Sequence, residues 1–181
     1  GSITVPADTG TVLTSGSALS SFPTGFANGI TEADQWRIVA NIGLSAGTSD
    51  ITTQWERVDT DFSIIGSGMS ESSGSFTFPA TGIYLISIVI TFSPSPSASD
   101  YNGAFIAIST NGGSSYNNRF ISWDSASGSD YSSVSGNVIV DVTSTTNFRA
   151  LMRGDVSTAT TLIGDTNNVR TGLTFIRLGD T

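Results

Sequence analysis

The stretch from Gly74 to Phe92, which reads GSFTFPATGIYLISIVITF, constrains the fold of this chain more than any other. A short strand around Phe76 and Phe78 should stop at Pro79, because proline fixes φ and cannot donate a hydrogen bond to a neighbouring strand. Residues 79–82 have the composition of a turn. A second, longer strand is then predicted from Ile83 to Phe92.

Both faces of this second strand are largely apolar. Successive side chains of a strand point to opposite faces, so the strand presents two sets of residues. One face carries Tyr84, Ile86, Ile88, Ile90 and Phe92, and the other carries Ile83, Leu85, Ser87, Val89 and Thr91. A strand with one wet face would alternate between apolar and polar residues. We therefore expect it to be covered twice, once by an opposing sheet and once by something else, such as another subunit.

The rest of the chain consists of short apolar runs separated by turn residues. Residues 31–34 have the spacing of a helix capping box, but the alternation that follows favours a strand from Trp36 to Ile42. Pro94 and Pro96 exclude a strand interior, and residues 111–113, Asn-Gly-Gly, are typical of a hairpin turn. Further strands are predicted at residues 55–58, 101–110, 119–123, 134–142, 148–153 and 172–178. This spacing indicates an all-β sandwich of two antiparallel sheets.

The composition and charge exclude several classes of function. The 181 residues contain no cysteine, histidine or lysine, and all seven cationic residues are arginine. The chain therefore lacks the usual general base, the Schiff-base amine, thiolate ligands and the commonest metal ligand. The formal net charge of -8 argues against partners such as nucleic acid or anionic lipid. No apolar run is long enough to cross a membrane, so no membrane insertion is expected.

The segment Phe76-Thr77-Phe78-Pro79-Ala80-Thr81-Gly82-Ile83-Tyr84 resembles the F-T-x-P-x-x-G-x-Y signature of the C1q-like domains, relatives of the tumour necrosis factor jelly rolls. Residues 33–37, 55–61, 68–74 and 174–180 together resemble C1q-like domains in structural proteins of marine bacterial viruses. The resemblance covers roughly residues 30–181. It implies a C1q/TNF-like jelly roll that buries an apolar face around a threefold axis.

Two parts of the chain are expected. Residues 1–30 are rich in glycine, serine and threonine, and Asp8 is their only charged residue, which predicts an N-terminal linker or arm. Residues 31–181 form the C1q-like jelly-roll domain. The N-terminal part is similar to stretches that precede C1q-like domains in viral fibre proteins, which implies contacts with other virion proteins. A flexible or surface-packed arm is the alternative. We expect the natural chain to continue upstream of Gly1.

A candidate ligand site lies where two polar loops should meet. In successive antiparallel strands the loops alternate between the two ends of a sandwich, so loops 93–100 and 124–130 should share one end. That end would carry Asp100, Tyr101, Trp123, Asp124, Asp130 and Tyr131. A sugar has one apolar face and a rim of hydroxyl groups, and aromatic rings beside carboxylates suit it. The alternative is that Trp123 or Tyr131 closes the core at a strand end.

Two shorter patterns have plainer explanations. Asp59 and Asp61 could supply oxygen ligands to Ca²⁺, but an EF-hand needs more carboxylates and a glutamate at its twelfth position, so a solvated turn is the alternative. Residues 153–155, Arg-Gly-Asp, spell a cell-adhesion tripeptide, and a strand end followed by a turn explains them as well. No catalytic residue and no metal ligand are assigned, and Ca²⁺ is the one cofactor that the sequence leaves open.

These observations lead to one functional prediction and two alternatives. We expect a non-enzymatic, homotrimeric module on the virion of a bacterial virus, as a fibre tip or head appendage, that binds a glycan or another receptor on the host surface. The alternatives are a secreted carbohydrate-binding lectin or adhesin, and a polysaccharide hydrolase or lyase with its active site in the loops. The trimer interface is expected to include Tyr84, Phe92, Phe175 and Ile176.

Overall fold

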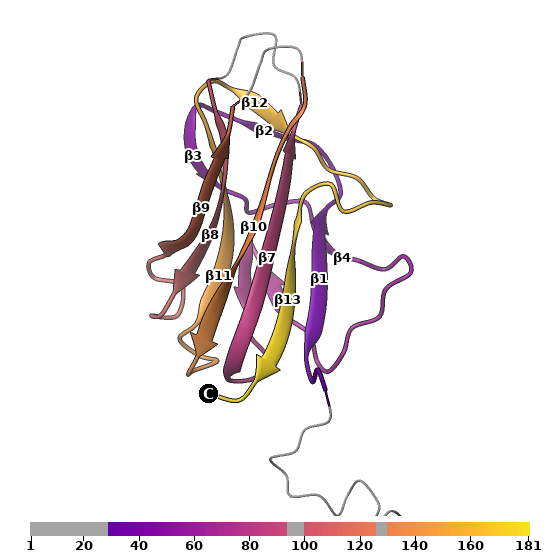
Figure 1. Ribbon diagram of the computed structural model, residues 1–181, viewed down its shortest axis with the longest axis vertical. Helices are drawn as coiled ribbons and strands as arrows, with labels where there is room; N and C mark the ends of the chain where they lie inside the picture. The colour runs from indigo at the N-terminus through magenta and orange to yellow at the C-terminus, as the bar shows by residue number, and fades with distance from the viewer. Residues whose placement is uncertain (1–28, 94–99, 126–129) are drawn as a thin grey trace, which may run out of the picture.

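The computed structural model describes residues 29–93, 100–125 and 130–181, which form two antiparallel sheets packed face to face (Figure 1). In these residues, sheet one contains seven strands: β1 (Ala33–Ile38), β2 (Ile42–Leu44), β4 (Trp55–Arg57), β7 (Gly82–Phe92), β10 (Ser132–Val142), β12 (Thr160–Leu162) and β13 (Gly172–Gly179). Sheet two contains six: β3 (Gly47–Asp50), β5 (Ser70–Ser72), β6 (Ser75–Thr77), β8 (Asn102–Ser109), β9 (Asn117–Asp124) and β11 (Arg149–Val156). The predicted all-β sandwich is confirmed. In the same described residues no helix is long and apolar enough to cross a membrane.

The central strand of sheet one is β7. It pairs with β10 over its whole length, from Gly82 opposite Val142 to Phe92 opposite Ser132. On its other side it pairs with β13 and, at its last residue, with β12. Figure 1 shows β7 between β10 and β13. The strand predicted at residues 83–92 is therefore confirmed, and the rest of sheet one is arranged around it.

The single strand predicted from Trp36 to Ile42 is wrong, because the chain breaks there into β1 and β2. The first of these pairs with β13 and the second with β12. At the break, Asn41 Oδ1 accepts a hydrogen bond from Gly164 N at 3.0 Å. A Cβ on Gly164 would lie only 2.4 Å from the carbonyl carbon of Ala40. The close approach of the segment around Gly164 ends the strand here. The alternation of side chains in the sequence could not predict this contact.

The C1q-like signature has a structural reason in the turn that joins β6 to β7. Tyr84 Oη donates a hydrogen bond to the carbonyl oxygen of Ala80 at 3.0 Å, which ties the strand to the turn. The Tyr84 ring packs edge-on against Phe78, with ring centroids 4.9 Å apart. Gly82 has a φ of 142°, and a Cβ there would lie 2.5 Å from Gly179 O. The aromatic, glycine and tyrosine positions of the signature together fix one turn.

Three of the four residues expected at a trimer interface lie in the core of the single chain. Tyr84, Phe92 and Phe175 are 1%, 0% and 1% exposed, because the opposing sheet covers the face of sheet one that carries them. The prediction for these three side chains is therefore wrong. Ile176 lies on the other face, opposite Leu85, and is half-buried. The outward face of β7 carries Ile83, Leu85, Ser87, Val89 and Thr91.

Candidate functional site

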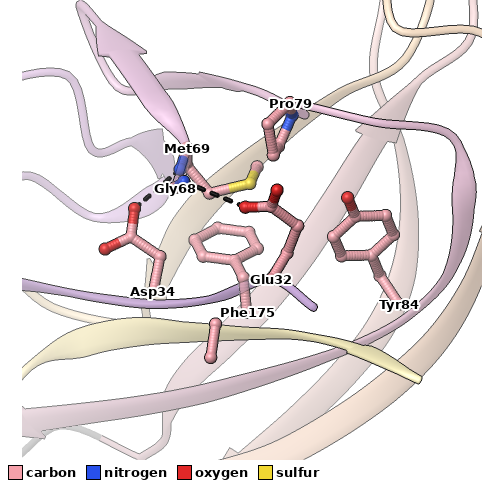
Figure 2. A pocket seen from close by; sticks show the side chains of 8 residues that line it. Glu32, Asp34, Gly68, Met69, Pro79, Tyr84 and Phe175 are labelled. Carbon is pink, nitrogen blue, oxygen red and sulfur yellow. Dashed lines mark hydrogen bonds between the residues drawn. The ribbon is translucent and has the colours of Figure 1, made fainter. Parts of the chain in front are cut away.

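A small pocket between β1 and the loop that precedes β5 is filled by the chain itself (Figure 2). Glu32 Oε2 accepts hydrogen bonds from the backbone nitrogens of Ser67 and Gly68 at 2.8 and 3.0 Å. Asp34 Oδ2 accepts one from Met69 N at 2.7 Å, and both carboxylates point at the loop in Figure 2. The pocket leaves no volume for a water molecule. These two carboxylates anchor the loop, and we assign them no ligand.

Asp34 is a buried anion whose partners are all structural. It is 2% exposed and accepts hydrogen bonds from Trp36 Nε1 at 2.9 Å and from Arg57 Nε at 3.0 Å, besides the bond from the loop. The Arg57 guanidinium lies 4.7 Å from the centre of the Trp36 ring, so a cation–π contact supports the same pair. Such a fully bonded carboxylate has little capacity left for a ligand.

Asp59 belongs to an ion-pair network on the outer face of sheet one. Arg37, which is 1% exposed, donates through Nη2 to Asp59 Oδ1 at 2.6 Å and to Glu56 Oε2 at 2.8 Å. Burial alone would lower the pKa of Arg37, but the bonds to Glu56 and Asp59 raise it, and Arg37 in turn lowers the pKa of Asp59. Across residues 29–93, 100–125 and 130–181, no three aspartate, glutamate, histidine or cysteine residues are grouped so that they could hold a metal ion. The carboxylate of Asp59 is thus the partner of an arginine.

The Arg-Gly-Asp tripeptide lies inside β11, so the prediction that it marks a strand end and a turn is wrong. Arg153 Nε donates to Asp50 Oδ1 at 2.6 Å, and Arg153 Nη1 donates to Asn118 Oδ1 at 2.7 Å. Gly154 and Asp155 are buried. The tripeptide is therefore part of the sheet and does not form an exposed adhesion loop.

A row of side chains crosses the outer face of sheet two near one end of the sandwich. Trp123 of β9 lies opposite Gly103 of β8, Gly103 lies opposite Asp155 of β11, and Asp155 lies opposite Thr48 of β3. Trp123 Nε1 donates a hydrogen bond to Asp155 Oδ2 at 2.9 Å, and Thr48 Oγ1 donates one to Asp155 Oδ1, also at 2.9 Å. Four strands thus hold one indole ring and one carboxylate in fixed positions.

The Trp123 ring lies across the backbone of Gly103. A Cβ at position 103 would lie 2.5 Å from Trp123 Cδ1 and 3.3 Å from Asp155 Cβ, so glycine leaves the space that the ring occupies. Phe105 supports the ring edge-on, with ring centroids 5.4 Å apart. Trp123 is nevertheless 53% exposed, whereas Asp155 is 9% exposed. With Tyr101 these two residues line an open hollow of about 390 Å³, which we call the Trp123 hollow.

The structure brings two of the six predicted ligand-site residues, Tyr101 and Trp123, to this hollow. The two loops leave the same end of the sandwich, as predicted, since Asn102 lies opposite Asp124 and Asn102 Nδ2 donates to Ser132 Oγ at 2.7 Å. Residues 94–99 and 126–129 of these loops lie outside the described residues.

The other four predicted residues lie around the hollow without lining it. Asp124 points to the opposite face of β9 from Trp123 by strand alternation. Asp100 and Asp130 are exposed at strand ends, and Tyr131 is 65% exposed. The exposure of Tyr131 and Trp123 excludes the alternative that they close the core. Asp155 and Thr48 were missed, because only the cross-strand register brings them to Trp123.

An apolar row crosses the outer face of sheet one. Ile139 of β10 lies opposite Leu85 of β7, Leu85 opposite Ile176 of β13, and Ile176 opposite Ala33 of β1, which is bridged to Ile65. Ile139 and Ile65, at the two ends, are 63% and 45% exposed. The three residues between them are half-buried. We call these five residues the apolar row.

A second hollow, of about 280 Å³, continues the apolar row at the edge formed by β9 and β10. Arg119 of β9 lines it, and within the described residues the side chain of this arginine makes no hydrogen bond or ion pair, whereas the side chains of the other six arginines make at least one. The residues that line this hollow are Ile108, Thr110, Arg119, Ile139, Val140, Asp141 and Phe148.

No protein-family model matches the sequence, and no curated protein matches it. Solved structures do match. Murine APRIL, at pH 8.5, has a TM-score of 0.59 at 17% identity, over 81% of this chain and 98% of that chain. Eiger TNF from S. frugiperda has a TM-score of 0.59 at 11% identity, over 82% and 93%. The globular domain of zebrafish complement 1qA has a TM-score of 0.53 at 12% identity, over 83% and 99%. The chain therefore has the jelly-roll fold of tumour necrosis factor-like and C1q-like domains, as the signature at residues 76–84 implied.

Proposed function

We propose that this chain is a non-enzymatic recognition module that works as a homotrimer on the particle surface of a bacterial virus. In this proposal the domain forms a fibre tip or head appendage and binds a receptor on the host. Residues 1–30 connect it to other virion proteins. The observation that carries the proposal is the apolar row on the outer face of sheet one.

The apolar row has the character of a subunit interface. A monomer would leave a continuous apolar strip in water, with Ile139 63% exposed at one end and Ile65 45% exposed at the other. Soluble monomers rarely expose large contiguous apolar patches, and a closed symmetric oligomer covers them. C1q-like and tumour necrosis factor-like jelly rolls bury such a face around a threefold axis, so the fold favours a trimer.

The second hollow fits the same assembly. Contacts in a threefold ring are heterologous, so two different patches of neighbouring subunits meet. The hollow extends the apolar row to the edge between β9 and β10, and Arg119 offers it a charge that has no partner within the described part of the chain. The Trp123 hollow lies on the other sheet, so this assembly leaves it open to a receptor.

The absence of histidine, lysine and cysteine supports a non-enzymatic role, because it removes the usual general base and two common nucleophiles. The viral setting rests on the resemblance of residues 30–181 to C1q-like domains in structural proteins of marine bacterial viruses. A secreted lectin would carry the same Trp123 hollow. It would differ from the viral module in its location, because it would not be attached to virus particles.

Light scattering on the full chain tests the trimer. We expect a mass near three times 18.7 kDa that persists on dilution to nanomolar protein, because a large apolar interface dissociates slowly. A stable monomer at micromolar concentration would overturn the trimer. Antibodies against the domain should label intact virus particles in electron micrographs, whereas a secreted lectin would be recovered apart from particles.

A further inference from the structure

We propose that the Trp123 hollow binds a neutral saccharide, with one pyranose ring stacked on the indole of Trp123 and one hydroxyl group bonded to Asp155. This inference rests on the proposed function, because it names the class of receptor that the recognition module would bind. The site is formed by Tyr101, Trp123 and Asp155 on the outer face of sheet two.

Trp123 is an exposed ring that the fold holds in one orientation. Its Nε1 is bonded to Asp155, its Cδ1 and Nε1 atoms occupy the space beside Gly103 that a Cβ would fill, and Phe105 packs against it. The other two tryptophans, Trp36 and Trp55, pack against the core instead. A ring that is already ordered loses little conformational entropy when a ligand stacks on it. One face of a pyranose ring presents C–H groups, and these suit the π face of an indole.

Asp155 is placed to accept a hydroxyl donor beside this ring. Each of its oxygens accepts one hydrogen bond from the protein, from Trp123 and from Thr48. A carboxylate has about four lone-pair positions, so each oxygen retains capacity for a further donor. No ion pair involves Asp155 among the described residues, and the nearby Arg153 is bonded to Asp50 and Asn118. The acceptor is therefore fixed in position and not neutralised by a cation of this chain.

The charge around the hollow disfavours acidic sugars. Asp100 adjoins Tyr101 in the sequence and is exposed, and Asp155 itself lines the hollow. The carboxylate of a uronic acid would meet like charges, which costs affinity. A quaternary ammonium ion suits the charge, but the hollow is open and does not surround a cation with aromatic faces, as cation-binding cages do. A ring with hydroxyl groups and no charge fits both Trp123 and Asp155.

The test is calorimetric titration of the full chain with three sets of probes. These are neutral hexose oligomers with β-1,3 and β-1,4 linkages, oligomers of uronic acids, and choline chloride. We expect saturable binding of at least one neutral oligomer, with an affinity that does not change between low and high salt, because no charge on the ligand is paired. Its binding should also alter tryptophan fluorescence, since Trp123 is the most exposed of the three tryptophans.

Variants of the hollow assign this binding to Trp123 and Asp155. Trp123→Ala should lower the affinity at least about tenfold, and Trp123→Phe should lower it less, because phenylalanine keeps an aromatic face. Asp155→Asn should weaken binding several-fold. Ile121→Ala is the matched control: Ile121 lies on β9, faces the same way as Trp123 and is 46% exposed, but it does not line the hollow. Its affinity should equal that of the unmodified chain.

The inference is overturned if no neutral oligomer binds, if choline or uronic acids bind and neutral sugars do not, or if Trp123→Ala binds as well as Ile121→Ala. These failures can be separated from failure of the proposed function. If the chain is a trimer and antibodies against it label virus particles, but no neutral oligomer binds, only the saccharide inference is wrong. If the chain is a monomer that binds a neutral oligomer through Trp123, only the trimer is wrong.

Discussion

The outer faces of the two sheets differ in how far the chain itself completes them. On sheet two, the outward-facing Phe105 and Leu151 of the central strands are only 4% and 3% exposed, whereas Ile121 and Trp123 of the edge strand β9 are 46% and 53% exposed. On sheet one, the apolar row is half-buried at its centre. At its two ends, Ile139 is 63% exposed and Ile65 is 45% exposed. Both faces carry exposed apolar side chains, so apolar content alone does not distinguish a ligand site from a subunit interface.

What separates the two faces is how their exposed side chains are held. The Trp123 ring is fixed by a hydrogen bond, by an aromatic neighbour and by the space above a glycine. The side chains of the apolar row have no polar atoms that could orient them. A fixed ring with an acceptor beside it suits a small hydroxylated ligand, whereas an adaptable apolar strip suits a second protein surface.

The largest expected effect is on assembly. Ile139→Asp should convert the trimer to a monomer at micromolar concentration, because it places a charge in the apolar contact of each interface. The same change at Ile121, on the outer face of sheet two, should leave the mass near three chains. Light scattering measures both variants, and far-ultraviolet circular dichroism checks that each is folded. Dissociation of both would show that the two faces are not distinct in assembly.

The next effect is on stability and concerns the outer face of sheet two. Gly103→Ala should lower the free energy of unfolding by about 1–3 kcal/mol, because the new methyl group overlaps the Trp123 ring. The control is Gly43→Ala on β2, where a Cβ meets nothing within 4 Å and the expected change is within about 0.5 kcal/mol. Urea denaturation followed by fluorescence gives both numbers. Equal stability of the two variants would mean that the ring moves aside freely, and the preorganised hollow would then lose its support.

A smaller effect on acid stability is expected from the ion pair between Arg37 and Asp59 on the outer face of sheet one. Because Arg37 lowers the pKa of Asp59 in the folded state, this pair contributes stability above the unfolded pKa of an aspartate, near 3.9. That contribution is lost as the pH falls through the lower folded pKa. Arg37→Met should therefore make the decline of the melting temperature between pH 6 and pH 3 shallower.

Part of the acid sensitivity should survive in that variant. The pKa of Asp165 is lowered to about 2 by hydrogen bonds from the backbone of Asn167 and Asn168, and Arg37 plays no part in this. Melting curves of both proteins at several pH values measure the difference. Parallel pH profiles for the variant and the unmodified chain would contradict the assignment to Asp59.

The last prediction is that a change of pH in the neutral range has no effect on either face. Between about pH 6 and 8.5 neither the mass nor the tryptophan fluorescence should change, because aspartate and glutamate ordinarily titrate near 4 and arginine above 12, and the chain has no histidine or cysteine. The α-amino group is the one ordinary exception. A transition in this window that is seen in one observable and not the other would assign a titrating group to one face.

Much of the fold could be predicted from alternation and turn residues, and the error at β7 shows the limit. Period-two alternation predicts that Tyr84 and Leu85 lie on opposite faces, and this is confirmed. It does not say which face looks inward when both are apolar. The larger side chains of Tyr84 and Phe92 fill the core, so the outward face is the smaller and more polar set.

The candidate site was predictable in part for a related reason. Loop alternation was sufficient to bring Tyr101 and Trp123 to one end of the sandwich. Asp155 lies 32 residues from Trp123 in the chain and meets it only through the pairing of β9, β8 and β11. Strand registers between distant segments depend on the whole sheet, and a single sequence does not display them. Nothing in the sequence around Gly103 indicates that this glycine leaves space for the Trp123 ring.

The order in which β7 meets its neighbours has a consequence for the time course of biosynthesis. This strand leaves the ribosome with residue 92, but its two main partners, β10 and β13, span residues 132–142 and 172–179. Ribosomes add roughly 5–20 residues per second, and pairings between distant segments form slowly. The most apolar strand of the molecule therefore waits several seconds for either ladder, with both of its faces open to other nascent chains. Conditions that lengthen this interval should favour aggregation during synthesis without changing the stability of the finished fold.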